Sequence, residues 1–467
     1  MADLRPNPAA SLGDDQREGP GLERALGLWQ ITASGVGIII GAGIYVLIGS
    51  ATALAGPRVW ISFALAAGLS ALTGIGYAEL ASMFPKAGAE FEYARHAYPP
   101  WVAFLVGWLM FAGLIVAAAA VALGFGRYVV RFVEVPPWIA ALGLIAFVAV
   151  IAWSGIRRSA RITVALSLVQ VGGLVYVIAI GVPHLGQVDL LSGDGIGAGG
   201  LIAASALVFF AFIGFDEVIT LAEETRDPTR TVPRALLLAL GLSTLLYIGA
   251  AMAAVSVIGA SSLGASERPL ADVLDHALGG RGADVLAAIA LIATTNTTLL
   301  CLTATSRLQY GMASAGALPE PFTRLGAKTR APYVAIGVSA VVAAAFVLLR
   351  DLTLVASVTD LAIYLVFIAV DLAVVILRFR LPDHPRPFRA PGAIGRVPVL
   401  PVFGLLAVLI MLPALQWEAL ALGAGLCAIG LGVYGLLQRA ALPPGGLTPM
   451  EQGRTRRSRT PSRRATP

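Results

Sequence analysis

Two apolar stretches of this 467-residue chain carry residues that a continuous membrane helix does not need. The first contains four glycines within nine residues, at Gly35, Gly37, Gly41 and Gly43. Each glycine inside a helix costs about 1 kcal/mol relative to alanine. Small residues four apart also serve the close packing of membrane helices, so packing and a local interruption are both open for this stretch taken alone.

The second stretch carries a glycine and two carboxylates, in the run Phe209-Phe210-Ala211-Phe212-Ile213-Gly214-Phe215-Asp216-Glu217. A helix that is interrupted inside a membrane leaves free carbonyl groups at one end and free N–H groups at the other. Carbonyls suit an ammonium group, and N–H groups at the positive end of a helix suit a carboxylate. Two interruptions together therefore predict a binding site for an α-amino acid, which presents both groups.

The elements that must position these residues are membrane helices. Apolar residues make up 57% of the chain and charged residues only 13%, about half of what a soluble domain carries. A membrane span needs about 20 apolar residues. We predict an all-α polytopic membrane protein whose twelve spans lie in the nearly charge-free stretches 27–55, 59–84, 101–130, 138–153, 162–182, 201–221, 235–260, 283–305, 333–349, 352–377, 397–415 and 417–437.

The two interrupted stretches open corresponding parts of the chain. Transporters built from inverted repeats carry a broken helix at matching places in their two halves. We therefore expect a first five-span unit at 22–182, a second at 201–378, and two extra spans within 396–438. The terminal segments 1–21 and 443–467, rich in Pro, Gly and Arg, are expected to be disordered.

Charge and motifs limit the class of protein. With both termini in the cytoplasm, most of the 33 Lys and Arg residues fall on the inner side, as the positive-inside rule requires of a plasma-membrane protein. The net charge of +6 thus reflects topology and not nucleic-acid binding. The sequence has no phosphate-binding loop of the G-x-x-x-x-G-K-[ST] type. The four histidines are too scattered for a metal site, and we expect neither an enzyme nor a cofactor.

Polar residues inside spans are candidates for ion coupling or selectivity, because burying them unpaired is costly. Asp216 suggests a cap on the half-helix after the second interruption, and Glu217 a residue that tunes selectivity or carries a proton. Asp360 and Asp371 lie about three helical turns apart on one face, which we expect to line the interior. Glu79 suggests an ion pair with an arginine at the inner membrane surface.

A polar run at 294–298 allows two interpretations. Hydroxyl groups can bond back to their own helix, which gives them a structural role. Alternatively Thr294, Asn296 and Thr297 face the first span near Gly37 and form an oxygen-lined site for a sodium ion.

Five motifs in order resemble the amino acid–polyamine–organocation superfamily of permeases, in its bacterial group related to cationic amino-acid transporters. The resemblance covers roughly residues 22–440. It rests on the runs Ile39-Ile40-Gly41-Ala42-Gly43-Ile44-Tyr45, Tyr77 to Tyr93, Phe209 to Arg234, Ser306 to Pro319, and Pro385 to Gly392.

The resemblance implies a LeuT-type fold, a five-plus-five inverted repeat with helices 1 and 6 broken and two extra helices. It places the substrate carboxylate on the N–H groups of Ala42, Gly43 and Ile44. The ammonium would meet carbonyl groups near Ile38, Ile39 and Phe209 to Phe212, so that the substrate-binding set is Ile38, Ile39, Ile40, Gly41, Ala42, Gly43, Ile44, Phe209, Phe210, Ala211, Phe212 and Gly214. It makes Phe212 and Phe215 aromatic gates.

The chain departs from the family pattern at Gln170. In proton-coupled relatives this position holds a lysine in place of a sodium ion, and a glutamine cannot take up and release that proton. Coupling through H⁺ at another group, coupling through Na⁺, and plain exchange all remain open.

Together these features predict a permease that imports or exchanges amino acids across the membrane by alternating access. A non-transporting amino-acid sensor on the same fold is the alternative from another class, and a polyamine or amine carrier is a further one. The partners expected are a small-molecule amino acid and the lipid bilayer, and the oligomeric state is left open.

Overall fold

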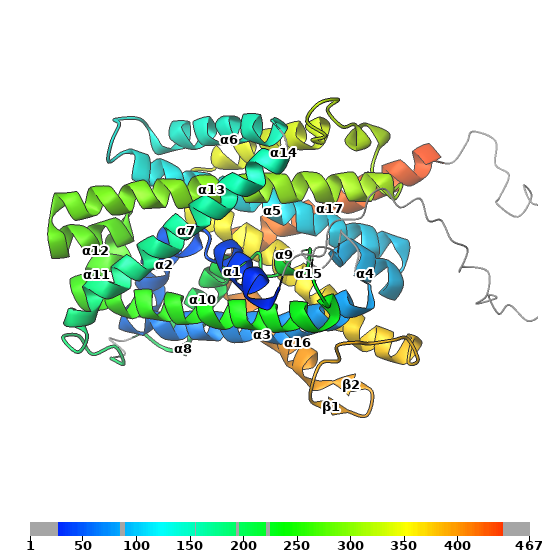
Figure 1. The fold of residues 1–467 in the computed structure, drawn as a ribbon, viewed down its shortest axis with the longest axis horizontal. Helices are drawn as coiled ribbons and strands as arrows, with labels where there is room; N and C mark the ends of the chain where they lie inside the picture. The colour runs from blue at the N-terminus through cyan, green and yellow to red at the C-terminus, as the bar shows by residue number, and fades with distance from the viewer. Residues whose placement is uncertain (1–26, 85–88, 155, 193–195, 221–224, 442–467) are drawn as a thin grey trace, which may run out of the picture.

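The computed structural model describes residues 27–84, 89–154, 156–192, 196–220 and 225–441. The terminal segments for which disorder is expected, 1–21 and 443–467, lie outside these residues. Within the described part the chain is almost entirely helical, and its regular sheet is the two-stranded hairpin of β1 (Ala393–Ile394) and β2 (Val397–Pro398) (Figure 1).

Long apolar helices dominate the described chain. Seven helical stretches are long and apolar enough to cross a membrane, and five apolar helical stretches are shorter. The protein is thus a polytopic helical membrane protein. The main helices are α1 (Leu28–Ile39), α2 (Gly43–Ala55), α3 (Val59–Met83), α5 (Pro100–Val129), α6 (Pro137–Trp153), α7 (Ile156–Gly181), α8 (Ala198–Val208), α10 (Pro228–Ile258), α13 (Gly280–Ser314), α14 (Tyr333–Val347), α15 (Leu352–Arg380), α16 (Val399–Met411) and α17 (Trp417–Ala441).

Short helices and 3₁₀ turns complete the described chain. They are α4 (Ala89–Ala97), α9 (Glu217–Thr220), α11 (Ala260–Ala265) and α12 (Pro269–Leu278), with the 3₁₀ turns η1 (Gly56–Arg58), η2 (Val182–His184), η3 (Phe209–Phe212), η5 (Glu320–Thr323) and η6 (Leu412–Ala414). Those at 209–212, 217–220 and 412–414 lie inside predicted spans, whereas α4, η1, α12 and η5 lie between predicted spans.

Helix α5 lies at the centre of the packing, where it contacts α13, α15 and α6. Nearly all of its middle residues are buried, and they include the four consecutive alanines 117–120. Such small side chains let neighbouring helices approach closely in a membrane. At Gly113 an added Cβ would lie 3.2 Å from the Cβ of Ala362 on α15. Helix α5 is therefore the scaffold against which α13 and α15 are fixed.

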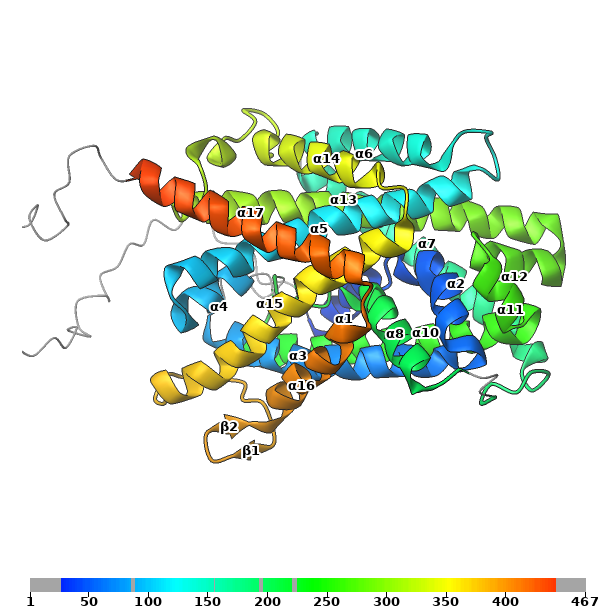
Figure 2. The same ribbon diagram turned by 180° about the vertical axis from the view of Figure 1, so that it is seen from behind.

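The remaining helices lie on two sides of this centre. Helices α6 and α14 pack together on one side, whereas α3, α8, α10 and α16 lie on the other (Figures 1 and 2). Helix α1 packs on α10, and α2 packs on α8. At Gly35 an added Cβ would come within 2.9 Å of Ala239 in α10, so this glycine permits the α1–α10 contact. Helices α1 and α2, which form the first predicted span, and α8, which begins the sixth, therefore lie in the same group of helices.

A buried ion pair joins α3 to α15. Arg378 donates two hydrogen bonds to the Glu79 carboxylate, at 2.9 Å from Nε and 2.6 Å from Nη2. The backbone N–H of Ala390 adds a third at 2.8 Å, and Arg386 Nε lies 3.3 Å away. Both members of the pair are at most 2% exposed. The predicted pairing of Glu79 with an arginine is confirmed, and it also holds the loop before α16.

Removing one partner of this pair should destabilise the protein strongly. We expect Glu79→Gln to lower the free energy of unfolding by about 3–5 kcal/mol, because Arg378 would keep its charge in a buried place without a carboxylate partner. Arg95→Gln is the matched control. Arg95 pairs with Glu92 in α4 at 3.3 Å but is 51% exposed, and exposed pairs contribute below about 1 kcal/mol. Thermal unfolding in detergent measures both, and equal losses in the two variants would contradict this assignment.

Candidate functional site

The first interruption separates α1 from α2 at residues 40–42. The N–H of Gly41 donates to the carbonyl of Ile39 at 2.7 Å, and the N–H of Ala42 donates to Thr297 Oγ1 of α13 at 2.9 Å. A Cβ at Gly41 would lie 2.9 Å from that same Thr297 oxygen. Thr297 thus supplies the acceptor that a continuous helix would have supplied, and Gly41 leaves room for it.

The second interruption follows α8. There the chain tightens into η3, turns at Gly214, and resumes as α9 at Glu217. Gly214 has a φ of +107°, a conformation that side chains other than glycine rarely adopt. The N–H of Glu217 donates to the carbonyl of Gly214 at 3.1 Å. The helix is therefore broken where the glycine and the two carboxylates predicted it.

The two interruptions touch each other. A Cβ at Gly43 would lie 2.5 Å from Ala211 Cα of η3. The hydroxyl of Tyr247, on α10, lies 2.7 Å from the Ile39 carbonyl and 2.8 Å from the Ala211 carbonyl, so its one proton bridges the two breaks. Sequence reasoning missed Tyr247. The single tyrosine of α10, in the middle of a predicted span, is the signal that could have found it.

Several backbone groups at the breaks keep bonding capacity. The resemblance assigned three N–H groups to a carboxylate, and that of Ala42 is bonded to Thr297. The N–H groups of Gly43 and Ile44 lie in the first turn of α2 and have no partner within the helix. The Ile39 carbonyl accepts from both the Gly41 N–H and the Tyr247 hydroxyl, which occupies both of its lone pairs. The Ala211 carbonyl accepts from Tyr247 and has a second lone pair. The site thus offers donors from α2 and an acceptor from η3.

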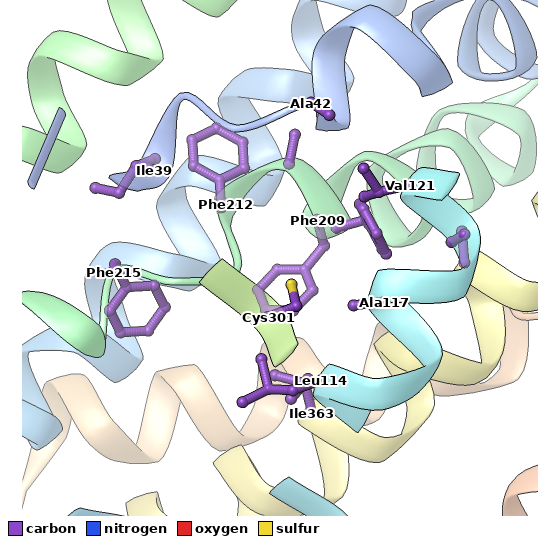
Figure 3. Close-up of a cluster of buried hydrophobic side chains, with 14 of the residues drawn as sticks. Ile39, Ala42, Leu114, Ala117, Val121, Phe209, Phe212, Phe215, Cys301 and Ile363 are labelled. Atoms are coloured by element: carbon purple, nitrogen blue, oxygen red, sulfur yellow. The ribbon is translucent and has the colours of Figure 1, made fainter. Parts of the chain in front are cut away.

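Apolar side chains from five parts of the chain converge beside the breaks (Figure 3). The five residues predicted from the sequence are Ile39, Ala42, Phe209, Phe212 and Phe215. Helices α5, α13 and α15 add side chains that carry no signal in the sequence, because apolar residues surround each helix and none of these is distinguished by type. These are Leu114, Ala117, Val121, Cys301 and Ile363. None of the ten carries a charge, so this part of the site favours an apolar group.

The two predicted gate residues pack in different places. The Phe212 ring lies 5.1 Å from that of Tyr247, whereas the Phe215 ring lies 5.6 Å from Tyr77 of α3 and 5.4 Å from Phe367 of α15. Phe212 and Phe215 are both fully buried. Phe215 therefore fills the space between the α9 end of the broken span and the helices α3 and α15.

The predicted ion site is divided between two places. Gln170 Nε2 donates to the Gly37 carbonyl at 3.0 Å, and Ser167 Oγ donates to the same carbonyl at 3.2 Å. Asn296 Nδ2 donates to Ser167 Oγ at 3.3 Å. Thr297 faces Ala42 instead. Both lone pairs of the Gly37 carbonyl are thus taken by neutral donors, with Gln170 at the centre of the group.

The other polar candidates differ in their surroundings. Thr294 bonds back to the Ala290 carbonyl of its own helix at 2.8 Å, as the structural interpretation of this run predicts. Asp216 is buried beside Glu90 of α4, a residue that sequence reasoning missed. Burial, together with the charges of Asp216 and Glu217, raises the pKa of the Glu90 carboxyl to about 8. Asp360 is buried in α15.

The contact between the two breaks gives a stability prediction. Gly43→Ala should lower the free energy of unfolding by about 1–3 kcal/mol, because the new Cβ must displace the backbone of Ala211 in a packed interior. Gly68→Ala, in α3, is the matched control, since its Cβ would meet nothing within 4 Å. Thermal midpoints of the two purified variants give the comparison, and a Gly43→Ala midpoint no lower than that of Gly68→Ala would show that the breaks do not press on each other.

Comparison with known proteins places this site in a family. The family model described as amino acid permease matches residues 26–426. The branched-chain amino acid permease BcaP of Bacillus subtilis is 30% identical over 439 residues, which are 90% of this chain and 94% of that protein. The methylthioribose transporter of the same organism is 28% identical, with coverages of 91% and 95%. The vacuolar cationic amino acid transporter 4 of Arabidopsis thaliana is 30% identical, over 78% of this chain and 64% of its own length. This chain, with its two interrupted helices and their apolar surroundings, belongs to the amino acid permease family and is a transporter, not an enzyme.

Proposed function

We propose that this protein is a secondary transporter for α-amino acids with uncharged, apolar side chains, which it carries across the plasma membrane by alternating access. The observation that carries the proposal is the combination at the two breaks. Polar backbone groups lie there beside side chains that carry no charge. An aliphatic amino acid is divided in the same way, since its ammonium and carboxylate groups are polar and its side chain is apolar.

The backbone groups suit the zwitterion. The N–H groups of Gly43 and Ile44 lie at the positive end of α2, where a carboxylate is favoured. The Ala211 carbonyl lies across the contact between the breaks, next to the Tyr247 hydroxyl, and keeps one lone pair for a further donor. An ammonium group there would meet an oxygen acceptor that a membrane interior otherwise lacks. Substrate binding would then replace the direct contact of Gly43 with Ala211.

The apolar side chains determine the substrate class in this proposal. Leu114, Ala117 and Ile363 would surround the substrate side chain, together with Phe209 and Cys301. A lysine or arginine side chain would place its charge among these apolar side chains and away from water, which is unfavourable. The same argument opposes a polyamine. The name of the relative BcaP agrees with an aliphatic substrate, whereas the methylthioribose transporter shows that family membership alone does not define the substrate.

Alternating access is the remaining part of the proposal. We infer that all twelve predicted stretches cross the bilayer, with both termini in the cytoplasm and the two five-span units related as an inverted repeat. The residues at the breaks are buried, with Ala42 and Phe212 both 0% exposed, so a substrate reaches them only when helices move apart. A sensor on the same fold would bind an amino acid without moving it, and exchange across a vesicle membrane separates the two functions.

A ligand panel tests the substrate class. Purified protein should be stabilised by L-leucine, L-isoleucine and L-valine, by about 2.7 kcal/mol at 100 times the Kd, and not by L-arginine, L-lysine or putrescine. Thermal midpoints give the binding result. Exchange of labelled L-leucine in proteoliposomes shows whether binding leads to transport. Stabilisation by cationic ligands alone would overturn the proposal, and binding without exchange would favour the sensor.

A single substitution should alter the size of the accepted side chain. Ala117→Leu adds three carbon atoms beside Phe209 and Cys301, so L-leucine should bind at least about tenfold more weakly while L-alanine binds as before, given that one methylene contributes about 1–3 kcal/mol. Ala345→Leu makes the same change on the exposed surface of α14 and serves as the control. Equal loss of both ligands in Ala117→Leu would place the substrate side chain elsewhere.

A further inference from the structure

Four polar residues of α15 lie in one stripe along the helix. Thr353, Asp360, Tyr364 and Asp371 are spaced by seven, four and seven residues, which places them on one face. Thr353 Oγ1 lies 3.5 Å from Ser50 Oγ of α2, and the Tyr364 hydroxyl donates to the Ala206 carbonyl of α8 at 3.1 Å. Asp360 lies between these two contacts. It therefore faces α2 and α8. Helix α2 follows the first interruption and α8 precedes the second, and both lie on the same side of the two breaks.

Asp360 differs from the other carboxylates of the spans. It is 0% exposed, and neither of its carboxyl oxygens has a hydrogen-bond partner among the residues that the structure describes. Asp371, on the same stripe, accepts a hydrogen bond from Thr73 at 3.0 Å through Oδ2, while its Oδ1 has no partner among the described residues. Glu79 is paired with Arg378.

Of the elements packed on α15, η3 carries no titratable side chain, whereas α3 carries Tyr77 and Glu79 and α4 carries Glu90, Glu92, Tyr93, Arg95 and His96. The contacts of α3 with α15 lie further along the helix, at Phe367, Asp371 and Arg378.

The elements beside Asp360 bring no cation to it. Within the described residues, α8 and α16 contain no titratable side chain. Helix α2 contributes only Tyr45, whose hydroxyl donates to the Gln170 carbonyl. Helix α5 carries Arg127 and Tyr128 near its far end, and Tyr128 donates to the Tyr45 carbonyl.

Helices α17 and α15 itself complete these surroundings. In α17, Glu418 is exposed at the first turn, Arg439 is exposed at the last, and Cys427 and Tyr434 are partly buried. On α15 itself the nearest titratable group is the Tyr364 hydroxyl, which is already donated to Ala206.

A negative charge at this place would have neither a counter-ion nor a donor. Burying such a carboxylate in a membrane interior is strongly unfavourable, whereas the protonated acid is neutral. The closed arrangement of α2 and α8 over α15 therefore requires a proton on Asp360. When these two half-helices move away, water reaches the carboxyl group and the proton can exchange with the outer solution.

We propose that Asp360 is a proton-binding site on the outer side of the transporter, and that it must be protonated from outside before α2 and α8 close. The site rests on the proposed function, because closure is a step of alternating access. It does not involve the group formed by Gly37, Ser167 and Gln170, which contains no titratable side chain. Uptake should therefore rise as the external pH falls, through Asp360.

The test is uptake of labelled L-leucine into right-side-out proteoliposomes at constant internal pH. In the wild-type protein, uptake should fall at least about fivefold between an external pH of about 6 and about 8, as expected for one titrating group. Asp360→Asn mimics the protonated state, so its uptake should change by less than about 1.5-fold over the same range. Asp360→Glu should restore the pH dependence. Asp371→Asn, the matched control on the same helix face, should keep the wild-type profile.

Three results would overturn the proposal. The first is an Asp360→Asn variant that keeps the wild-type pH profile. The second is loss of that profile in Glu90→Gln or Asp216→Asn while Asp360→Asn retains it. The third is wild-type uptake that falls when sodium in the outer solution is replaced by choline, together with an Asp360→Asn variant whose uptake no longer depends on sodium.

A measurement on the wild-type protein covers the cases in which Asp360→Asn does not fold or L-leucine is not the substrate. Dicyclohexylcarbodiimide reacts with protonated carboxyl groups in apolar surroundings, and peptide mass spectrometry locates the adduct. We expect an adduct on Asp360 at pH about 6 that decreases towards pH about 9. If the adduct forms but untreated protein does not exchange L-leucine, the proton site stands and the proposed function is contradicted. Absence of the adduct at both pH values would overturn the proton site.

Discussion

Every peptide group in a membrane interior must find a hydrogen-bond partner, and this requirement governs the site. The chain leaves helical geometry at residues 40–42 and again after Val208, where water is not at hand to replace the lost bonds. The partners come from distant parts of the sequence. Thr297 accepts from Ala42, Tyr247 lies against Ile39 and Ala211, and Gln170 donates to Gly37. Helices α13, α10 and α7 are thus necessary for the breaks to exist at all.

The same requirement sorts the charged residues of the spans. Glu79 and Arg378 neutralise each other at the end of α15, and Asp371 is held by Thr73 between glycines of α3 and α16. These groups have a structural explanation in their contacts. Asp360 has no such contact within the described chain. A buried carboxyl group without a hydrogen-bond partner is stable there only when it is protonated. Its protonation is therefore coupled to any conformational change that exposes it to water.

Relatives with different named substrates share this architecture, among them a branched-chain amino acid permease and a methylthioribose transporter. The backbone groups at the breaks do not depend on side-chain identity, so they can be kept while the substrate changes. Selectivity then lies with the side chains that α5, α13 and α15 bring to the breaks. In this chain those side chains are apolar, among them Leu114, Ala117 and Ile363. We therefore attribute the substrate class to a few positions on otherwise structural helices.

The sequence by itself determined the membrane class, the family, the two breaks and the pairing of Glu79. Each follows from a local property: hydropathy over about 20 residues, glycine in a helix, or a charge at the end of a span. The sequence also identified Gln170 and Thr297 as residues near the first break. It did not identify Tyr247, Glu90, or the side chains of α5 that lie beside the breaks. Only the tertiary structure decided the roles of these residues, because hydrogen bonds such as that of Tyr247 to Ile39 join residues 208 positions apart. For the same reason, only the tertiary structure decided which buried carboxylate lacks a hydrogen-bond partner. Uniformly apolar helices carry no local signal of which face meets which neighbour, and that choice is made only when they pack.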